Sequence, residues 1–327
     1  MAEWLVEEGI GEKRAVLVRD EHIVAARLQW PGGLTPGQVA EAQLVSRQAG
    51  SGRGTARLAS GEEAMVARLP RSASEGAMIR LEVTRAAMPE AERRKLAQAQ
   101  PTDRPLRAAP SFVEQLTSAG HKVQTVRRFP IVLGWEELWQ EAWEGSVTFN
   151  RGVLLFHPTP AMTLIDIDGE DDPLALAKAA TAPLAAALRR FDIGGSIGID
   201  FPTVSNRAGR KAIDTMLGEA LADWPHERTA MNGFGFVQLV ARMERPSILA
   251  LLTHAPAGAA ARQLLRQAEG LEGAGAILLT CPASTAAALR PEWLDKLQRR
   301  AGRPVRLEVR PGQLDPGTGH AQLVPHE

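Results

Sequence analysis

The chain has 327 residues, 44% of them apolar, and its 38 basic and 38 acidic side chains give a formal net charge of zero. This composition excludes wholesale disorder and a globally basic nucleic-acid binder, although a local basic patch remains open. The single cysteine, Cys281, excludes internal disulfides and a Cys-x-x-Cys zinc site, and we expect a buried structural thiol. The N-terminus is acidic and no stretch approaches the roughly 20 apolar residues of a membrane span, so we expect a cytoplasmic protein without membrane contact.

Short strands are predicted for most of the first 88 residues. Residues 3–30 alternate apolar and polar side chains and predict a hairpin or a short meander. Residues 35–88 contain about five further short strands punctuated by Gly, Ser and Pro, which is typical of a small barrel. From Met88 the sequence changes to MPEAERRKLAQAQPTDRPLRAAP, which predicts a short charged helix followed by a proline-rich linker, together covering residues 89–110.

Two helices are predicted next. The segment SFVEQLTSAG begins with Ser111 and carries Glu114 three residues later, which is the signature of a capping box. In WEELWQEAWEG, Trp135, Trp139 and Trp143 recur at every fourth position and therefore share one helical face. We interpret this stripe as core packing rather than as a platform for nucleic-acid bases.

The pattern of residues 145–245 indicates an α/β sheet. Two strands joined by a tight turn at residues 150–152 lead to the strand TLIDID. A helix with Pro183 inside it, where a kink or a break is expected, connects this strand to the strand SIGIDF. Another helix and strand complete the order β-β-β-α-β-α-β, and residues 246–327 predict a small α/β domain.

Aspartates occupy the ends of the two strands that this helix connects. Asp166 and Asp168 share one side of the first strand, and Asp200 ends the second. Because a β-α-β crossover makes its strands parallel, we expect the three carboxylates to converge at one sheet edge. Hard oxygen ligands without a nearby His or Cys favour Mg²⁺ or Mn²⁺. The alternative is that Asp168 starts a loop, Asp171 or Asp172 caps the helix before Pro173, and Asp200 caps the helix that follows it.

The loop after Asp200 offers groups that would meet phosphate oxygens. PTVSNRAGRK places Asn206, Arg207, Arg210 and Lys211 just beyond the predicted metal site. The alternative for each of them is a solvated helix start.

These segments resemble a known family. WEELWQEAWEGSVTFNRGVLLFHPTPAMTLIDIDGE, LRRFDIGGSIGIDFPTVSNRAGRKAIDTMLGEAL, FGFVQLVAR and RPSIL together resemble the catalytic region of the ribonuclease E/G family. In that family, an IDIN strand and an IDF strand each supply an aspartate to one Mg²⁺. The resemblance implies that Asp166 and Asp200 are metal ligands. Asp168 stands where the family has Asn, and it would orient a ligand water or join the metal's ligands.

The same resemblance implies a multidomain α/β fold. Residues 1–34 and 100–145 would form a split ribonuclease-H-like subdomain, with residues 35–88 inserted as an S1-like β-barrel and 89–110 as a linker. Residues 145–245 would form a nuclease-like catalytic subdomain, and 246–327 a small C-terminal α/β domain.

Three differences from the family lead to further predictions. The segment that recognises an RNA 5′ monophosphate has no counterpart, so this form of sensing should be absent. The Cys-x-x-Cys link is missing, so we expect no zinc, and either a monomer or a dimer not linked by zinc. Residues 35–88 contain no aromatic side chain, which leaves phosphate contacts to arginines. These arginines include Arg47, Arg53, Arg57, Arg68 and Arg80.

The first functional hypothesis is therefore a Mg²⁺-dependent endoribonuclease for single-stranded RNA, leaving a 5′ phosphate and a 3′ hydroxyl. The second is an RNA-binding or scaffolding relative that has lost turnover. The third is a metal-dependent phosphodiesterase with another substrate.

Overall fold

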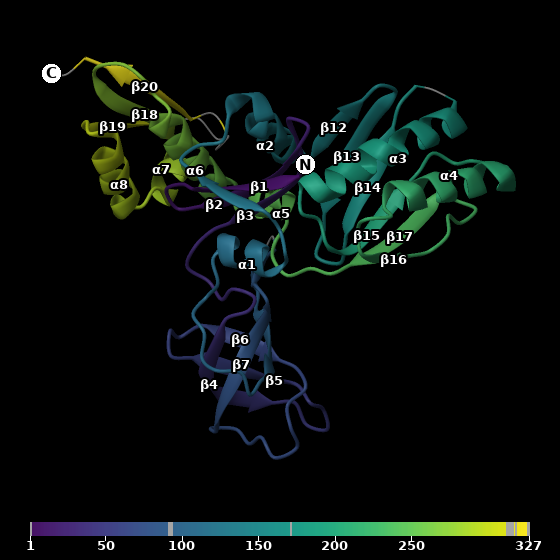
Figure 1. Cartoon of the computed structure of the whole chain (residues 1–327), viewed down its shortest axis with the longest axis horizontal. Helices are drawn as coiled ribbons and strands as arrows, with labels where there is room; N and C mark the ends of the chain where they lie inside the picture. Colours follow the sequence, from purple (N-terminus) through teal and green to yellow (C-terminus); the bar gives the residue numbers. More distant parts are fainter. Residues whose placement is uncertain (1, 91–93, 171, 312–316, 318, 326–327) are drawn as a thin grey trace.

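The computed structural model describes residues 2–90, 94–170, 172–311, 317 and 319–325, and all structural statements below concern these residues. The fold is mixed α/β (Figure 1). A closed barrel lies apart from the rest, a large sheet with α3 and α4 lies on one side, and a small C-terminal sheet lies on the other.

The N-terminal residues form the predicted meander. Strands β1 (Glu3–Glu8), β2 (Lys13–Arg19) and β3 (His22–Gln29) are antiparallel neighbours, and β11 (Val123–Val126) joins β1 in parallel. Helix α1 (Phe112–Ser118) packs its apolar side chains against this sheet. Its predicted capping box is confirmed, because the Glu114 amide donates to Ser111 Oγ and the Ser111 amide donates to the Glu114 carboxylate.

The predicted small barrel is confirmed, but its fifth strand lies beyond residues 35–88. The barrel order is β10-β6-β5-β4-β7, formed by β4 (Val39–Arg47), β5 (Gly54–Leu58), β6 (Glu63–Val66), β7 (Met78–Arg85) and β10 (Ala97–Pro101). The helix predicted within residues 89–110 is wrong where the structure describes it. Strand β8 (Met88–Pro89) pairs with β9 (Arg94–Lys95), and β10 then closes the barrel; residues 91–93 lie outside the described residues.

The large sheet follows the predicted order with one added strand. Its described strands are β12 (Ser146–Phe149), β13 (Gly152–Pro158), β14 (Thr163–Asp168), β15 (Gly195–Asp200), β16 (His226–Arg228) and β17 (Phe236–Ala241). They lie in the order β12-β13-β14-β15-β17-β16, and the short edge strand β16 was not predicted. Only the β14–β15 pair is parallel, because α3 (Pro173–Arg190) connects these two strands as a crossover.

One face of this sheet is buried. Helices α3 and α4 (Arg207–Ala220) cover it (Figure 1), and Ile165, Ile167, Ile197 and Ile199 pack there in the main core. Of the kink or break predicted at Pro183, the break does not occur: α3 continues as one helix through this residue.

Helix α2 (Trp135–Glu144), which precedes the large sheet in the chain, contributes to the main core. It follows the short 3₁₀ turn η1 (Ile131–Leu133) and packs beside α5 (Ile248–His254). The tryptophan stripe is confirmed as core packing, since Trp135 and Trp139 are buried and Trp143 stacks on Trp139.

The C-terminal part is a small α/β module, as predicted. It contains α6 (Pro256–Glu269), β18 (Ala276–Pro282), α7 (Ala283–Ala288), α8 (Pro291–Ala301), β19 (Val305–Arg310) and β20 (His320–Val324).

Cys281 in β18 is free and fully buried, as predicted. Burial raises the pKa of its thiol, so the group stays protonated at neutral pH. Among the described residues, no helix is long and apolar enough to cross a membrane.

Candidate metal centre

The face of the large sheet opposite α3 and α4 carries the predicted aspartates. Side chains alternate along a strand, so Asp166 and Asp168 lie on the face opposite their buried isoleucine neighbours. Both carboxylates are exposed, and so is Asp200 at the end of β15. This open face therefore presents negative charge at the ends of two adjacent parallel strands.

Asp166 and Asp200 are direct partners in the β14–β15 register. Neighbouring strands lie about 4.8 Å apart, so the two carboxylates stand side by side. Among the described residues, neither carboxylate has a hydrogen bond or an ion pair with a cationic group. Like charges directly opposite each other destabilise a sheet, so this pair lowers local stability unless a positive group neutralises it.

Asp168 lies outside this pair. It is opposite Val153 of β13, and β15 ends before it could supply a partner on the other side. Its Oδ1 accepts a hydrogen bond of 2.8 Å from the amide of Gly169. Within the described ranges, no group of three or more His, Cys, Asp or Glu side chains could hold a metal ion. The described structure therefore does not bring the three carboxylates into one such group, and residues two apart on a strand are separated by about 7 Å.

The remaining pair still fits a divalent cation of the magnesium type. Mg²⁺ is bound in proteins through one or two carboxylates, with waters and substrate phosphates completing its ligands. Two exposed carboxylates on an open face, with no cationic side chain of the described residues paired to either of them, match that pattern. When bound, such an ion would stabilise charge on a phosphate and lower the pKa of a water molecule.

Among the aspartates that the structure describes, the capping alternative applies to Asp172. Asp172 caps α3, because its Oδ2 accepts a hydrogen bond of 3.1 Å from the amide of Ala175. Asp171 lies outside the described residues. Asp200 is not the cap of α4, since that position belongs to Asn206.

The loop residues predicted to meet phosphate divide into two groups. Asn206 Oδ1 accepts from the Gly209 amide at 2.6 Å, and Arg210 Nη1 donates to the carbonyls of Val204 and Ser205 at 2.8 Å each. These two side chains shape the loop and the start of α4. Arg207 and Lys211 are exposed on the first turns of α4, and the described residues give their side chains no partner.

The predicted barrel arginines are mostly engaged within the barrel. Arg47 donates to the backbone carbonyls of a neighbouring loop, Arg57 pairs with Glu63 at 2.7 Å, and Arg68 donates to Gln100 at 3.2 Å. Arg80 likewise pairs with Glu41 at 2.9 Å. Exposed pairs of this kind contribute only about 0–1 kcal/mol, so they break at little cost when a phosphate competes.

The aromatic surroundings of Asp200 were not predicted from the sequence. Phe236 is the register partner of Asp200 in β17, and its ring lies over Gly198. A Cβ added at Gly198 would stand 2.6 Å from Phe236 Cζ, so the ring occupies the space that a side chain would fill. Phe234, in the loop before β17, is 83% exposed. A glycine inside a strand pattern was the available signal, because it often marks such a close approach.

The same loop is held by local hydrogen bonds. Asn232 Oδ1 accepts from the amides of Phe234 and Phe236 at 2.9 and 3.1 Å. The amide of Phe201 donates to the carbonyl of Gly235 at 3.2 Å, which ties the loop to the residue after Asp200. The loop that carries the exposed Phe234 is thereby tied to the end of the strand that carries Asp200.

No family model matches the chain, and no curated protein is significantly similar to it. Evidence for the site therefore comes from its own geometry and from the motifs in the strands.

Proposed function

We propose that this chain is a Mg²⁺-dependent endoribonuclease acting on single-stranded RNA, with Asp166 and Asp200 as the ligands of the cation. The observation that carries the proposal is their direct pairing across two parallel strands on an open sheet face, without a protein counter-charge among the described residues. The resemblance of the surrounding strands to the ribonuclease E/G family supports the same reaction class. It also supports a ribonuclease-H-like fold for the N-terminal sheet and an S1-like fold for the barrel. The cytoplasmic location that the sequence predicts is part of the same proposal.

The other residues of the open face have supporting roles in this proposal. Arg207 and Lys211 would contact phosphates on one side of the carboxylate pair. Phe234 would stack on a base, a contact worth roughly 1–3 kcal/mol that the barrel cannot supply. Asp168 would position a water ligand rather than bind the cation directly. Recognition of a 5′ monophosphate by the family's route is not part of the proposal.

The proposal is tested by cleavage of a labelled A/U-rich single-stranded RNA. We expect cleavage with Mg²⁺ and none with EDTA or in the Asp200→Asn variant. Asp295→Asn makes the same chemical change at an exposed position of α8 and should cleave like the wild type. If Asp168→Asn leaves both metal affinity and cleavage unchanged, the role given to Asp168 is wrong.

Two results would favour other functions. RNA that is retained in a salt-dependent manner but stays intact with Mg²⁺ and Mn²⁺ would indicate an RNA-binding relative without turnover. If DNA or structured RNA competed for the site more strongly than single-stranded RNA, the result would indicate a phosphodiesterase with another substrate.

A further inference from the structure

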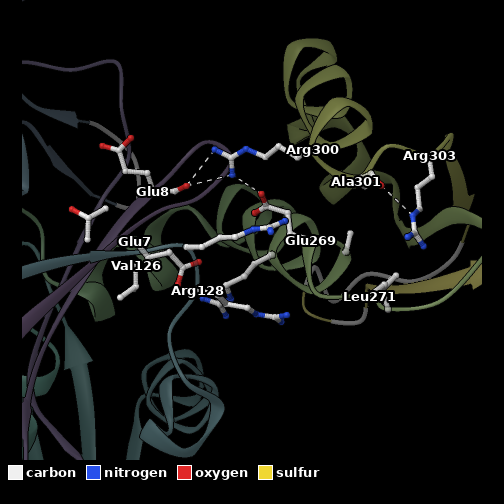
Figure 2. A pocket seen from close by; sticks show the side chains of 13 residues that line it. Glu7, Glu8, Val126, Arg128, Glu269, Leu271, Arg300, Ala301 and Arg303 are labelled. Carbon is white, nitrogen blue, oxygen red and sulfur yellow. Dashed lines mark hydrogen bonds and ion pairs between the residues drawn. The ribbon is translucent and has the colours of Figure 1, made fainter.

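A second charged site lies where the N-terminal sheet meets the C-terminal module. A cavity of about 450 Å³ is bounded by β1, the chain around β11, the end of α6 and the end of α8. Figure 2 shows the residues that line it. The cavity shares no residue with the Asp166–Asp200 pair. Its size falls in the range of about 300–1,000 Å³ that is usual for small-molecule sites.

Positive charge exceeds negative charge in this cavity. Its lining includes three carboxylates and a larger set of arginines, namely Arg127, Arg128, Arg266, Arg300 and Arg303. Each carboxylate already has a cationic partner. Glu7 pairs with Arg14, Glu8 with Lys13 and Glu269 with Arg300.

Three of the arginines have no acidic partner among the described residues. Arg127 and Arg128 are exposed, and neither makes a hydrogen bond or an ion pair there. Arg303 donates only to the backbone carbonyls of Ala301 and Gly273. Their guanidinium groups therefore remain available to an anion.

Arg266 adds a buried positive charge to the wall of the cavity. This side chain is only 6% exposed, and its Nη2 donates to Glu136 at 2.9 Å. Its Nε and Nη1 are buried without a hydrogen bond, and Nη1 lies 3.9 Å from the nearest Glu12 oxygen. Burial lowers the pKa of Arg266 to about 10, so it still carries its charge at neutral pH. These two nitrogens have almost no accessible surface and do not open onto the cavity, so Arg266 contributes its positive charge to an anion there rather than these two hydrogen bonds.

Arg128 is placed by a glycine. A Cβ added at Gly270, directly after α6, would overlap the Arg128 guanidinium. The guanidinium therefore lies on the backbone at this point, beside the cavity. Val126 and Leu271 also line the cavity and would contact an apolar part of a ligand.

We propose that this cavity binds a small, multiply charged phosphate ligand and that it recognises a diphosphate group. Several guanidinium groups around one cavity match the oxygens of a diphosphate through paired hydrogen bonds, and they exceed what one carboxylate ligand would need. A cavity of this size also suits a small ligand better than a continuous RNA backbone, which is usually bound along a groove.

The proposal is tested by calorimetric titration of the full chain with pyrophosphate and with ADP at constant ionic strength. EDTA is present throughout, so that no divalent cation draws the probe to Asp166 and Asp200. We expect one site per chain. Arg128→Gln should weaken binding at least about tenfold, because a charge-assisted contact is lost. Gly270→Ala should also weaken it, because the added Cβ displaces Arg128 without changing any charge.

Arg299→Gln is the matched control. Arg299 precedes Arg300 on α8, is exposed, and does not line the cavity, so this variant should bind like the wild type. Absence of binding by a folded protein at millimolar probe would overturn the proposal, and so would equal weakening by Arg299→Gln. Displacement of pyrophosphate by single-stranded RNA with hydroxyl ends would show that the cavity binds the phosphates of an RNA backbone. This result would contradict the proposal of a small ligand.

Discussion

At the scale of single residues, the open face is shaped by a glycine as much as by its carboxylates. Gly198 lies two residues before Asp200 and on the same face of β15. Phe236 and Leu164 approach it so closely that an added Cβ would stand 2.6 and 2.9 Å from their side-chain carbons. This packing sets where the Phe236 ring lies beside Asp200.

Gly198→Ala should lower the free energy of unfolding by about 1–3 kcal/mol, because the new methyl group forces Phe236 and Leu164 from their places. Urea unfolding measures the change. Gly233→Ala is the control, since nothing lies within 4 Å of a Cβ at that position. Equal stability of the two variants would mean that Phe236 does not depend on the gap at Gly198.

The residue scale also shows what the sequence could reveal about the site. The pairing of Asp166 with Asp200 was predictable, because a helical crossover between two strands makes them parallel. The separation of Asp168 from that pair depends on where β15 ends. The cap position taken by Asn206 depends on where α4 begins. Element boundaries of this kind are set by tertiary context, and a motif does not specify them.

At the scale of elements, the largest correction concerns β10. Its segment is charged and alanine-rich before the prolines, which locally favours a helix. Ala97 and Ala99 instead point into the barrel, and β10 pairs with β6 and β7 at once. Closing the barrel satisfies the backbone of both edge strands, and this gain outweighs a local preference worth tenths of a kcal/mol per residue.

Helix α3 shows a second case in which packing outweighs a local signal. Pro183 lacks the amide that would bond to the carbonyl of Ala179, yet the helix continues through it. Leu176, Ala180, Leu184 and Leu188 on the same helix are buried in the main core. The core contacts of this face hold the helix together across the missing hydrogen bond.

Pro183→Ala should therefore raise the free energy of unfolding by up to about 2 kcal/mol. A proline inside a helix costs about 3 kcal/mol, of which about 1 kcal/mol is offset because proline restricts the unfolded chain. Thermal or urea unfolding tests this. Pro173→Ala changes the first position of the same helix, where proline fits, and should give no gain. A Pro183→Ala variant less stable than the wild type would contradict this view of α3.

At the scale of the whole molecule, a buried ionic network joins distant parts of the chain. Arg14 of β2 is fully buried and lies between Glu7 and Glu12. Glu7 also accepts a hydrogen bond of 2.9 Å from the amide of Phe129, and Glu12 lies near Arg266 of α6. The N-terminal sheet, the segment before α2 and the C-terminal module thus share one set of charges.

Arg14→Met should cost about 3–5 kcal/mol at pH 7, because it leaves two buried carboxylates without their main partner. Lys13→Met, at the adjacent position, removes only an exposed pair with Glu8 and should cost less than about 1 kcal/mol. Similar losses in the two variants, measured by urea unfolding, would contradict a structural role for the network.

The cost of Arg14→Met should also depend on pH. Burial raises the pKa of Glu7 above 4.5, and Arg14 opposes this effect. A carboxyl with a raised folded-state pKa favours folding below its unfolded pKa, and that contribution is lost as pH rises through the folded pKa. Without Arg14 the pKa of Glu7 rises further, so the destabilisation should be largest at pH 7 and shrink as the pH falls towards 4.5. A destabilisation that is constant over this range would contradict that coupling.

The most direct test of the proposed metal centre is Mn²⁺ binding measured by electron paramagnetic resonance. The wild type and Asp295→Asn should each bind one ion per chain, whereas Asp166→Asn and Asp200→Asn should each bind at least about tenfold more weakly, because each removes one of two carboxylate ligands. Unchanged Mn²⁺ binding in both site variants would show that these two aspartates do not form a metal centre.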